Sequence, residues 1–137
     1  TKIPADAFYG CSSLQNIDIP NSVIEIGERA FTNCSKLTTI QIPYKVEEIW
    51  LDSFYGCENL QEIKLCSGNL STIDIYDGSI SRKSVVEYLK EKNIKISYDG
   101  TKSQFNEIKI GYYDDLRESL NGITIYCSDG SFVYGEE

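Results

Sequence analysis

Apolar residues recur at a fixed interval along the first half of the chain. Phe8, Phe31 and Phe54 are 23 residues apart. The same step relates four further columns of apolar residues: Cys11, Cys34 and Cys57; Leu14, Leu37 and Leu60; Ile17, Ile40 and Ile63; and Ile19, Ile42 and Leu65. So many matching columns identify an internal repeat. A unit with about six apolar positions cannot bury them alone, so we expect neighbouring units to stack.

Each unit has the pattern of a half-buried strand followed by a return segment. The Leu-x-x-Ile-x-Ile stretch alternates as a strand with one buried face does. Pro20 and Pro43 then end the strand, because proline has no N–H to donate to a ladder. Ile3, Ile26 and Ile49 mark the return on the opposite side. This pattern predicts a solenoid of stacked coils with parallel strands.

The second half repeats the strand pattern at a longer interval. Residues 93–96 (Asn-Ile-Lys-Ile) align with residues 62–65 at an offset of 31, and residues 122–125 follow after a further 29. The expected return segments contain Ile73 with Ile75, and Ile108 with Ile110. We therefore expect about five coils in a single domain, 1–137: regular repeats over 1–66 and enlarged, degenerate C-terminal repeats or a cap over 67–137.

The additional length of the last coils has helical and turn patterns. Ser84 to Lys92 places Val85, Tyr88 and Leu89 on one face of a helix, and Tyr112 to Leu120 is a shorter candidate. Asp-Gly pairs at 77–78, 99–100 and 129–130 predict turns. The chain starts in mid-repeat without a polar cap, so we expect upstream repeats or a cap in the parent protein.

The unit Ala-Phe-Tyr-Gly-Cys-Ser-Ser-Leu-Gln-Asn-Ile-Asp-Ile-Pro, at residues 7–20, resembles the BspA-like leucine-rich repeats of bacterial surface and secreted proteins. The similarity is close over residues 1–66. Residues 98–101 (Tyr-Asp-Gly-Thr) with 105–108 (Phe-Asn-Glu-Ile) are similar to segments at the ends of such arrays. The resemblance implies an α/β fold: a right-handed leucine-rich-repeat stack, with a parallel strand ladder on the concave face and short helices in the last two coils. It also implies adhesion or recognition at the cell exterior, with no shared catalytic residues and no cofactor.

Residues that flank the central isoleucine of each strand should point outward, because side chains alternate along a strand. Since leucine-rich repeats commonly bind partners on this sheet, these outward residues are the candidate site for a protein or glycan ligand. They are Asn16, Asp18, Thr39, Gln41, Glu62, Lys64, Lys95 and Thr124. The alternative is that they are only a solvated surface.

Composition narrows the possible functions. The 137 residues carry a formal net charge of −8, so the chain lacks the excess of positive charge that a nucleic-acid binder needs. The absence of histidine removes the Ser-His-Asp and Cys-His nucleophiles and most zinc sites. No apolar run is long enough to span a membrane. Residues 1–20 lack a signal-peptide pattern, so a secreted or surface location rests on the resemblance alone.

Other distinctive residues have structural interpretations beside functional ones. The column of Cys11, Cys34 and Cys57 fits buried packing, while a disulfide or a metal ladder stays open. Trp50 occupies the column of Gly27 and is expected to fill the core. Tyr9, Tyr44 and Tyr55 are candidate exposed aromatic contacts. The pair Glu47-Glu48 makes a poor acid–base dyad, because adjacent side chains point apart.

Three functions therefore remain open. The favoured one is a non-enzymatic recognition or adhesion module. The second is a structural spacer or C-terminal cap of a longer array, and the third is an accessory domain of a larger enzyme.

Overall fold

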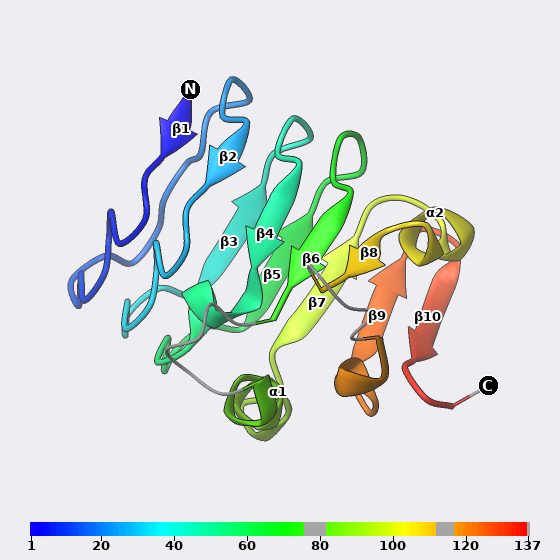
Figure 1. Cartoon of the computed structure of the whole chain (residues 1–137). Coiled ribbons are helices and arrows are strands. Elements are labelled where there is room, and N and C mark those ends of the chain that lie inside the picture. Colours follow the sequence, from blue (N-terminus) through cyan, green and yellow to red (C-terminus); the bar gives the residue numbers. More distant parts are fainter. Residues whose placement is uncertain (76–81, 112–116, 137) are drawn as a thin grey trace.

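The computed structural model describes residues 1–75, 82–111 and 117–136, and it shows strands stacked along one direction. The two chain ends lie at opposite ends of the stack (Figure 1). The strands are β1 (Lys2–Ile3), β2 (Glu25–Ile26), β3 (Thr39–Ile42), β4 (Glu48–Trp50), β5 (Glu62–Leu65), β6 (Thr72–Asp74), β7 (Lys95–Tyr98), β8 (Lys109–Ile110), β9 (Thr124–Cys127) and β10 (Gly130–Val133). The helices are α1 (Arg82–Glu91), α2 (Lys102–Asn106) and the short 3₁₀ turns Leu51–Phe54 and Arg117–Leu120.

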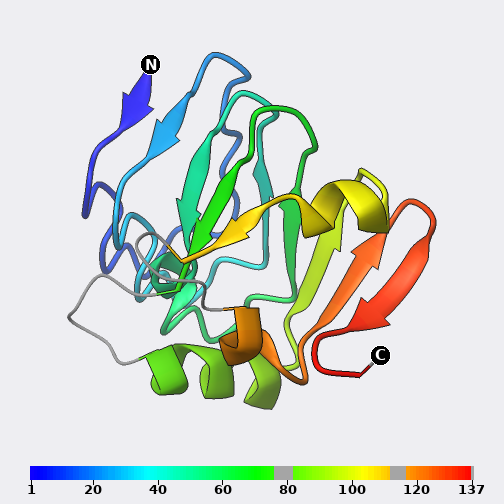
Figure 2. The same cartoon turned by 45° about the vertical axis from the view of Figure 1, so that its right-hand side comes forward.

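The strands form ladders in two layers, as the alternating strand and return segments predict. In one layer β3, β5, β7 and β9 are parallel neighbours, and β10 closes the sheet as an antiparallel strand. In the other layer β4, β6 and β8 are parallel, and β1 pairs with β2. Figure 2 shows the two layers facing each other, with α1 beneath them. These are the parallel ladders and short helices of a leucine-rich-repeat stack.

The core between the layers consists of the repeat columns. The Phe8 and Phe31 rings stack at 5.4 Å between centroids, and the Phe31 and Phe54 rings stack at 6.4 Å. The buried thiols tie adjacent units together, since Cys34 Sγ donates to the Phe8 carbonyl and Cys57 Sγ to the Phe31 carbonyl, both at 3.1 Å. The structural interpretation of the cysteine column is confirmed for these two thiols.

The first unit departs from the expected strand pattern. Residues 14–19 form no strand, and the ladder there retains one bond, from Thr38 N to the Gln15 carbonyl at 3.3 Å. The apolar side chains of this unit are only partly buried: Ile3, Phe8, Cys11, Leu14, Ile17 and Ile19. The partial burial of these side chains and the single bond to the next unit accompany the loss of the regular extended conformation in this segment.

The register of β7 also differs from the predicted alignment. Glu62 pairs with Lys95 and Ile63 with Ile96, so the true offset is two residues longer than 31. A shift of two residues leaves every side chain on the same face, so alternation alone cannot detect it. The second predicted offset holds, because Ile96 pairs with Ile125.

The helices agree with the sequence in part. Helix α1 is confirmed, with Val85 and Leu89 buried and Tyr88 half-buried. Of the second candidate, residues 117–120 form a 3₁₀ turn and residues 112–116 lie outside the described part of the chain, as does the Asp-Gly pair at 77–78. Helix α2 was not predicted, although Thr101 and Gln104 form a capping box at its start.

Candidate binding surface

Two rows of outward side chains run across the larger sheet. Each strand alternates, so Ile40, Ile63, Ile96 and Ile125 face the core and their neighbours face out. The first row consists of Thr39, Glu62, Lys95 and Thr124, and the second of Gln41, Lys64, Ser97 and Tyr126. We call these eight residues the polar face.

Six of the eight predicted site residues lie on the polar face. Asn16 and Asp18 are exposed, but they lie on the segment that forms no strand, outside the ordered rows. Sequence reasoning missed Ser97 and Tyr126, because the two-residue error in register assigned Lys95 to the row of Lys64. The same alternation, applied two residues further along β7 and β9, would have found both.

Side-chain contacts link the strands across the polar face. The Ser97 hydroxyl donates to Glu62 Oε2 at 2.7 Å. Lys95 Nζ lies 4.8 Å from the centroid of the Tyr126 ring, which is 43% exposed. The Glu62 carboxylate is thus held by a hydroxyl on β7, while the neighbouring ammonium group is turned toward β9.

A pocket of about 340 Å³ opens beside the β7–β9 end of the polar face. It lies between the C-terminal end of α1 and the starts of the two strands. Its polar lining consists of Lys90, Asn93, Lys95, Thr124 and Tyr126, and Leu89, Ile94, Gly122 and Ile123 complete it.

The opposite layer has a second pocket, which is acidic. Its volume is about 450 Å³, and its lining includes Glu25, Glu28, Glu48 and Trp50. Burial of Glu48, and then the nearby carboxylates of Asp74, Glu25 and Glu28, raise the pKa of the Glu48 carboxyl above its ordinary value.

The expectation that Trp50 fills the core is wrong. The ring lines this acidic pocket, is partly exposed and does not belong to the core cluster. At Gly27, the residue of the same column in the preceding unit, a side chain has no room, because an added Cβ would lie 2.3 Å from Ala5 N.

The buried thiols of Cys34 and Cys57 are not activated as nucleophiles. All five are free thiols, so the stacked column contains no disulfide. Burial raises the pKa of Cys57 to about 12 and also raises the pKa of Cys34, which disfavours the reactive thiolate. No group of three or more Cys, Asp or Glu side chains in the described ranges is arranged to hold a metal ion.

The aromatic candidates separate into exposed and packed side chains. Tyr9 is 50% exposed and Tyr44 is 45% exposed. Tyr55 instead packs against Tyr88 of α1, with ring centroids 5.0 Å apart. Neither exposed ring lies on the polar face.

Comparison with known proteins agrees with the repeat architecture. The family described as "BspA type Leucine rich repeat region" matches residues 1–103 in six copies, a range that includes β7 and ends within α2. No curated protein and no solved structure gives a significant match. Among the described helices, none has the length and apolar character of a transmembrane segment. With its strand ladders and a repeat match over most of its length, the chain belongs to the BspA-type leucine-rich repeat family.

Proposed function

We propose that this chain is a non-enzymatic recognition module that binds a protein or a glycan through the polar face. BspA-type repeats are generally associated with surface binding and are typically non-catalytic, which supports this class of function. We further propose that the chain forms a single solenoid domain with the polar face on its concave side, and that it acts in adhesion at the cell exterior, secreted or on the surface of a bacterium.

The observation that carries the proposal is the in-register arrangement of the polar face. Four parallel strands present eight outward side chains in two rows, and backbone pairing fixes the spacing between them. Neighbouring strands lie about 4.8 Å apart. A ligand that contacts several strands therefore meets a preorganised surface, which reduces the entropy cost of binding.

The proposal is tested by replacing exposed residues of the polar face that the core does not need. The variant Thr39→Ala, Gln41→Ala, Lys64→Ala removes three exposed side chains. We expect at least a tenfold loss of affinity for whichever matrix protein or glycan the wild-type chain binds on an array. Biolayer interferometry measures the affinity, and circular dichroism checks the fold.

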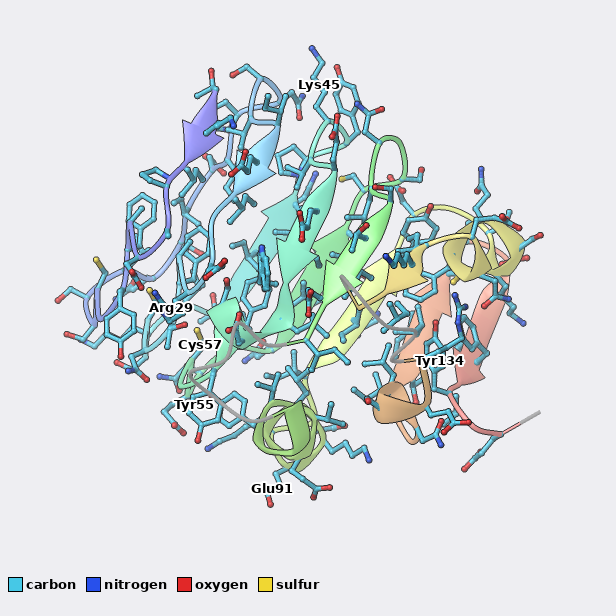
Figure 3. The ribbon with its side chains drawn as sticks, in the orientation of Figure 1. Arg29, Lys45, Tyr55, Cys57, Glu91 and Tyr134 are labelled. Atoms are coloured by element: carbon cyan, nitrogen blue, oxygen red, sulfur yellow. The ribbon has the colours of Figure 1, made fainter. Side chains whose placement is uncertain are left out.

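The matched control carries Asn21→Ala, Ser22→Ala and Lys45→Ala, which are also exposed and change the charge equally. Lys45 lies at the edge of the molecule opposite α1 (Figure 3). The control should bind like the wild type. Equal affinity of the wild type and the polar-face variant would refute the proposal, and an array without any bound partner would favour a structural spacer.

A further inference from the structure

The pocket between α1, β7 and β9 has the chemistry of a site for a negatively charged sugar. We propose that this pocket binds the anionic group of a saccharide that carries a carboxylate or a sulfate. The inference rests on the proposed function, since the pocket shares Lys95, Thr124 and Tyr126 with the polar face.

Positive charge is concentrated in this pocket, although the whole chain carries −8. Lys90 from α1 and Lys95 from β7 both line it. Neither ammonium group forms an ion pair with a carboxylate in the described part of the chain. By contrast, Lys92, two residues from Lys90, is paired with Glu58. Two lysines without carboxylate partners at one small cavity favour an anionic ligand.

The orientation of Lys95 supports this interpretation. Its cross-strand neighbour is Glu62, the natural partner for an ion pair. The Glu62 carboxylate instead accepts a hydrogen bond from Ser97, and the Lys95 ammonium group lies over the Tyr126 ring at the pocket. The charge of Lys95 thus lies at the Tyr126 ring beside the cavity, and it forms no ion pair with Glu62.

The end of the Lys90 side chain lies against Gly122 at the pocket. A Cβ added at Gly122 would lie 3.1 Å from Lys90 Cε and 3.2 Å from its Nζ, closer than most side chains tolerate. Gly122 also has φ +87°, in the left-handed region that favours glycine. The loop before β9 therefore leaves room for the lysine stem against its backbone.

The rest of the lining favours a saccharide over an acidic peptide. The cavity of about 340 Å³ is near the lower end of the range for small-molecule sites, roughly 300–1,000 Å³, and an extended peptide would need a groove. Tyr126 is 43% exposed, so the part of its ring that Lys95 does not cover offers an apolar surface for the C–H face of a sugar ring. The Asn93 amide and the Thr124 hydroxyl can exchange hydrogen bonds with sugar hydroxyls.

The experiment measures binding of four probes to the full chain by isothermal titration calorimetry. They are a glucuronate-containing tetrasaccharide, a sulfated tetrasaccharide, a neutral tetrasaccharide and a polyglutamate peptide. We expect at least one anionic saccharide to bind, with weaker binding at higher salt, and the neutral saccharide to bind at least tenfold more weakly. The first two probes distinguish carboxylate from sulfate as the preferred group.

Matched variants assign the binding to the pocket. The pair Lys90→Gln, Lys95→Gln should weaken the anionic saccharide at least tenfold, whereas Lys36→Gln, Lys45→Gln, with the same charge change, should leave the affinity unchanged. Tyr126→Ala should also weaken binding, whereas Tyr44→Ala, which removes a ring of similar exposure, should not.

Several results would overturn the assignment. These are equal binding of the neutral saccharide, tighter binding of polyglutamate, no binding of either anionic saccharide, or an affinity that survives Lys90→Gln, Lys95→Gln. If a partner from the array is lost in the polar-face variant but retained in the Lys90, Lys95 variant and no anionic saccharide binds, the proposed function stands and this inference fails. If the polar-face variant also retains every partner, the proposed function fails separately.

Discussion

Glu48 illustrates how the stacking of similar units brings like charges together. Its carboxyl is half-buried in β4, one side-chain oxygen has no hydrogen-bond partner, and the carboxylates of Asp74, Glu25 and Glu28 are close enough to raise its pKa. Glu25 is paired with Lys2, and Glu28 lies at 4.0 Å from Arg29. Glu48 is thus destabilising in its charged form.

At the residue scale we predict that Glu48→Gln stabilises the fold at neutral pH. Because the pKa of Glu48 is raised in the folded state, the protonated carboxyl contributes its full stability below the ordinary glutamate pKa. That contribution is lost as the pH rises through the pKa of the folded state. The neutral glutamine does not suffer this loss. We expect a gain of about 0.5 kcal/mol at pH 7, a small value because Glu48 is partly exposed, and no gain below about pH 4.

Thermal denaturation followed by circular dichroism at the two pH values measures this difference. The exposed neighbour supplies a control, since Glu47→Gln should change the melting temperature little at either pH. A melting temperature of Glu48→Gln that is lowered at pH 7 would contradict the assignment.

Single residues were predictable from the sequence where the repeat column determined their environment. Phe31, Cys34 and Cys57 are buried as their columns indicate. The environment of Trp50 was not predictable in this way. A repeat column predicts a position along the backbone, but it does not say how much room the neighbouring unit leaves for a side chain there. The backbone of residues 4–5 fills the space beside Gly27, and that contact is visible only in three dimensions.

At the element scale, α2 depends on its N-terminal cap. Thr101 Oγ1 accepts from Gln104 N at 3.2 Å, and Gln104 Oε1 accepts from Thr101 N at 2.8 Å. The helix is only Lys102–Asn106, yet it carries Phe105, which is 1% exposed, into the aromatic cluster with Tyr98 and Phe132. A short helix has few internal bonds, so the cap contributes a large share of its stability.

We therefore predict that Thr101→Ala lowers the free energy of unfolding by about 1 kcal/mol. Thr101→Ser keeps the hydroxyl acceptor and should retain most of the stability. Urea denaturation followed by tyrosine fluorescence compares the two variants with the wild type. Equal losses in both variants would show that the methyl group, not the cap, is responsible.

Whole elements differ in how well the sequence predicted them. Strands β3, β5, β7 and β9 follow from alternation, and the returns β4, β6 and β8 follow from the second isoleucine column. The pairing of β5 with β7 was misplaced by two residues, because Ile94 and Ile96 are both buried and both fit the pattern. The capping box was the available signal for α2. Alternation was therefore enough to predict that the residues of the polar face point outward. It was not enough to assign each residue to its row, or to include Ser97 and Tyr126.

At the scale of the whole molecule, stability is distributed unevenly along the stack. Residues 14–19 have partly buried apolar side chains and a single bond to the next unit, from Thr38 N to the Gln15 carbonyl, whereas β5 and β7 are each paired with a strand on both sides. Local opening costs less where fewer apolar contacts are broken.

We predict that backbone amides of residues 15–19 exchange with solvent at least tenfold faster than those of β5 and β7. Hydrogen–deuterium exchange with mass spectrometry measures this directly, because peptides from the two regions do not overlap. Uniform protection along the chain would instead mean that the stack opens only as one cooperative unit.

Within each paired strand, one set of residues determines the fold and the other set forms the outer surface. The chain needs 23 residues to pass from Thr39 to Glu62, 33 from Glu62 to Lys95 and 29 from Lys95 to Thr124, yet all four side chains lie in one row. The segments that connect successive strands differ in length, and the inward isoleucines keep the strands aligned. The inward and the outward positions of a strand can therefore diverge independently. The inward residues preserve the architecture, and the outward residues are free to change the ligand that is bound. A homologue with altered outward residues should keep this backbone and change its binding partner.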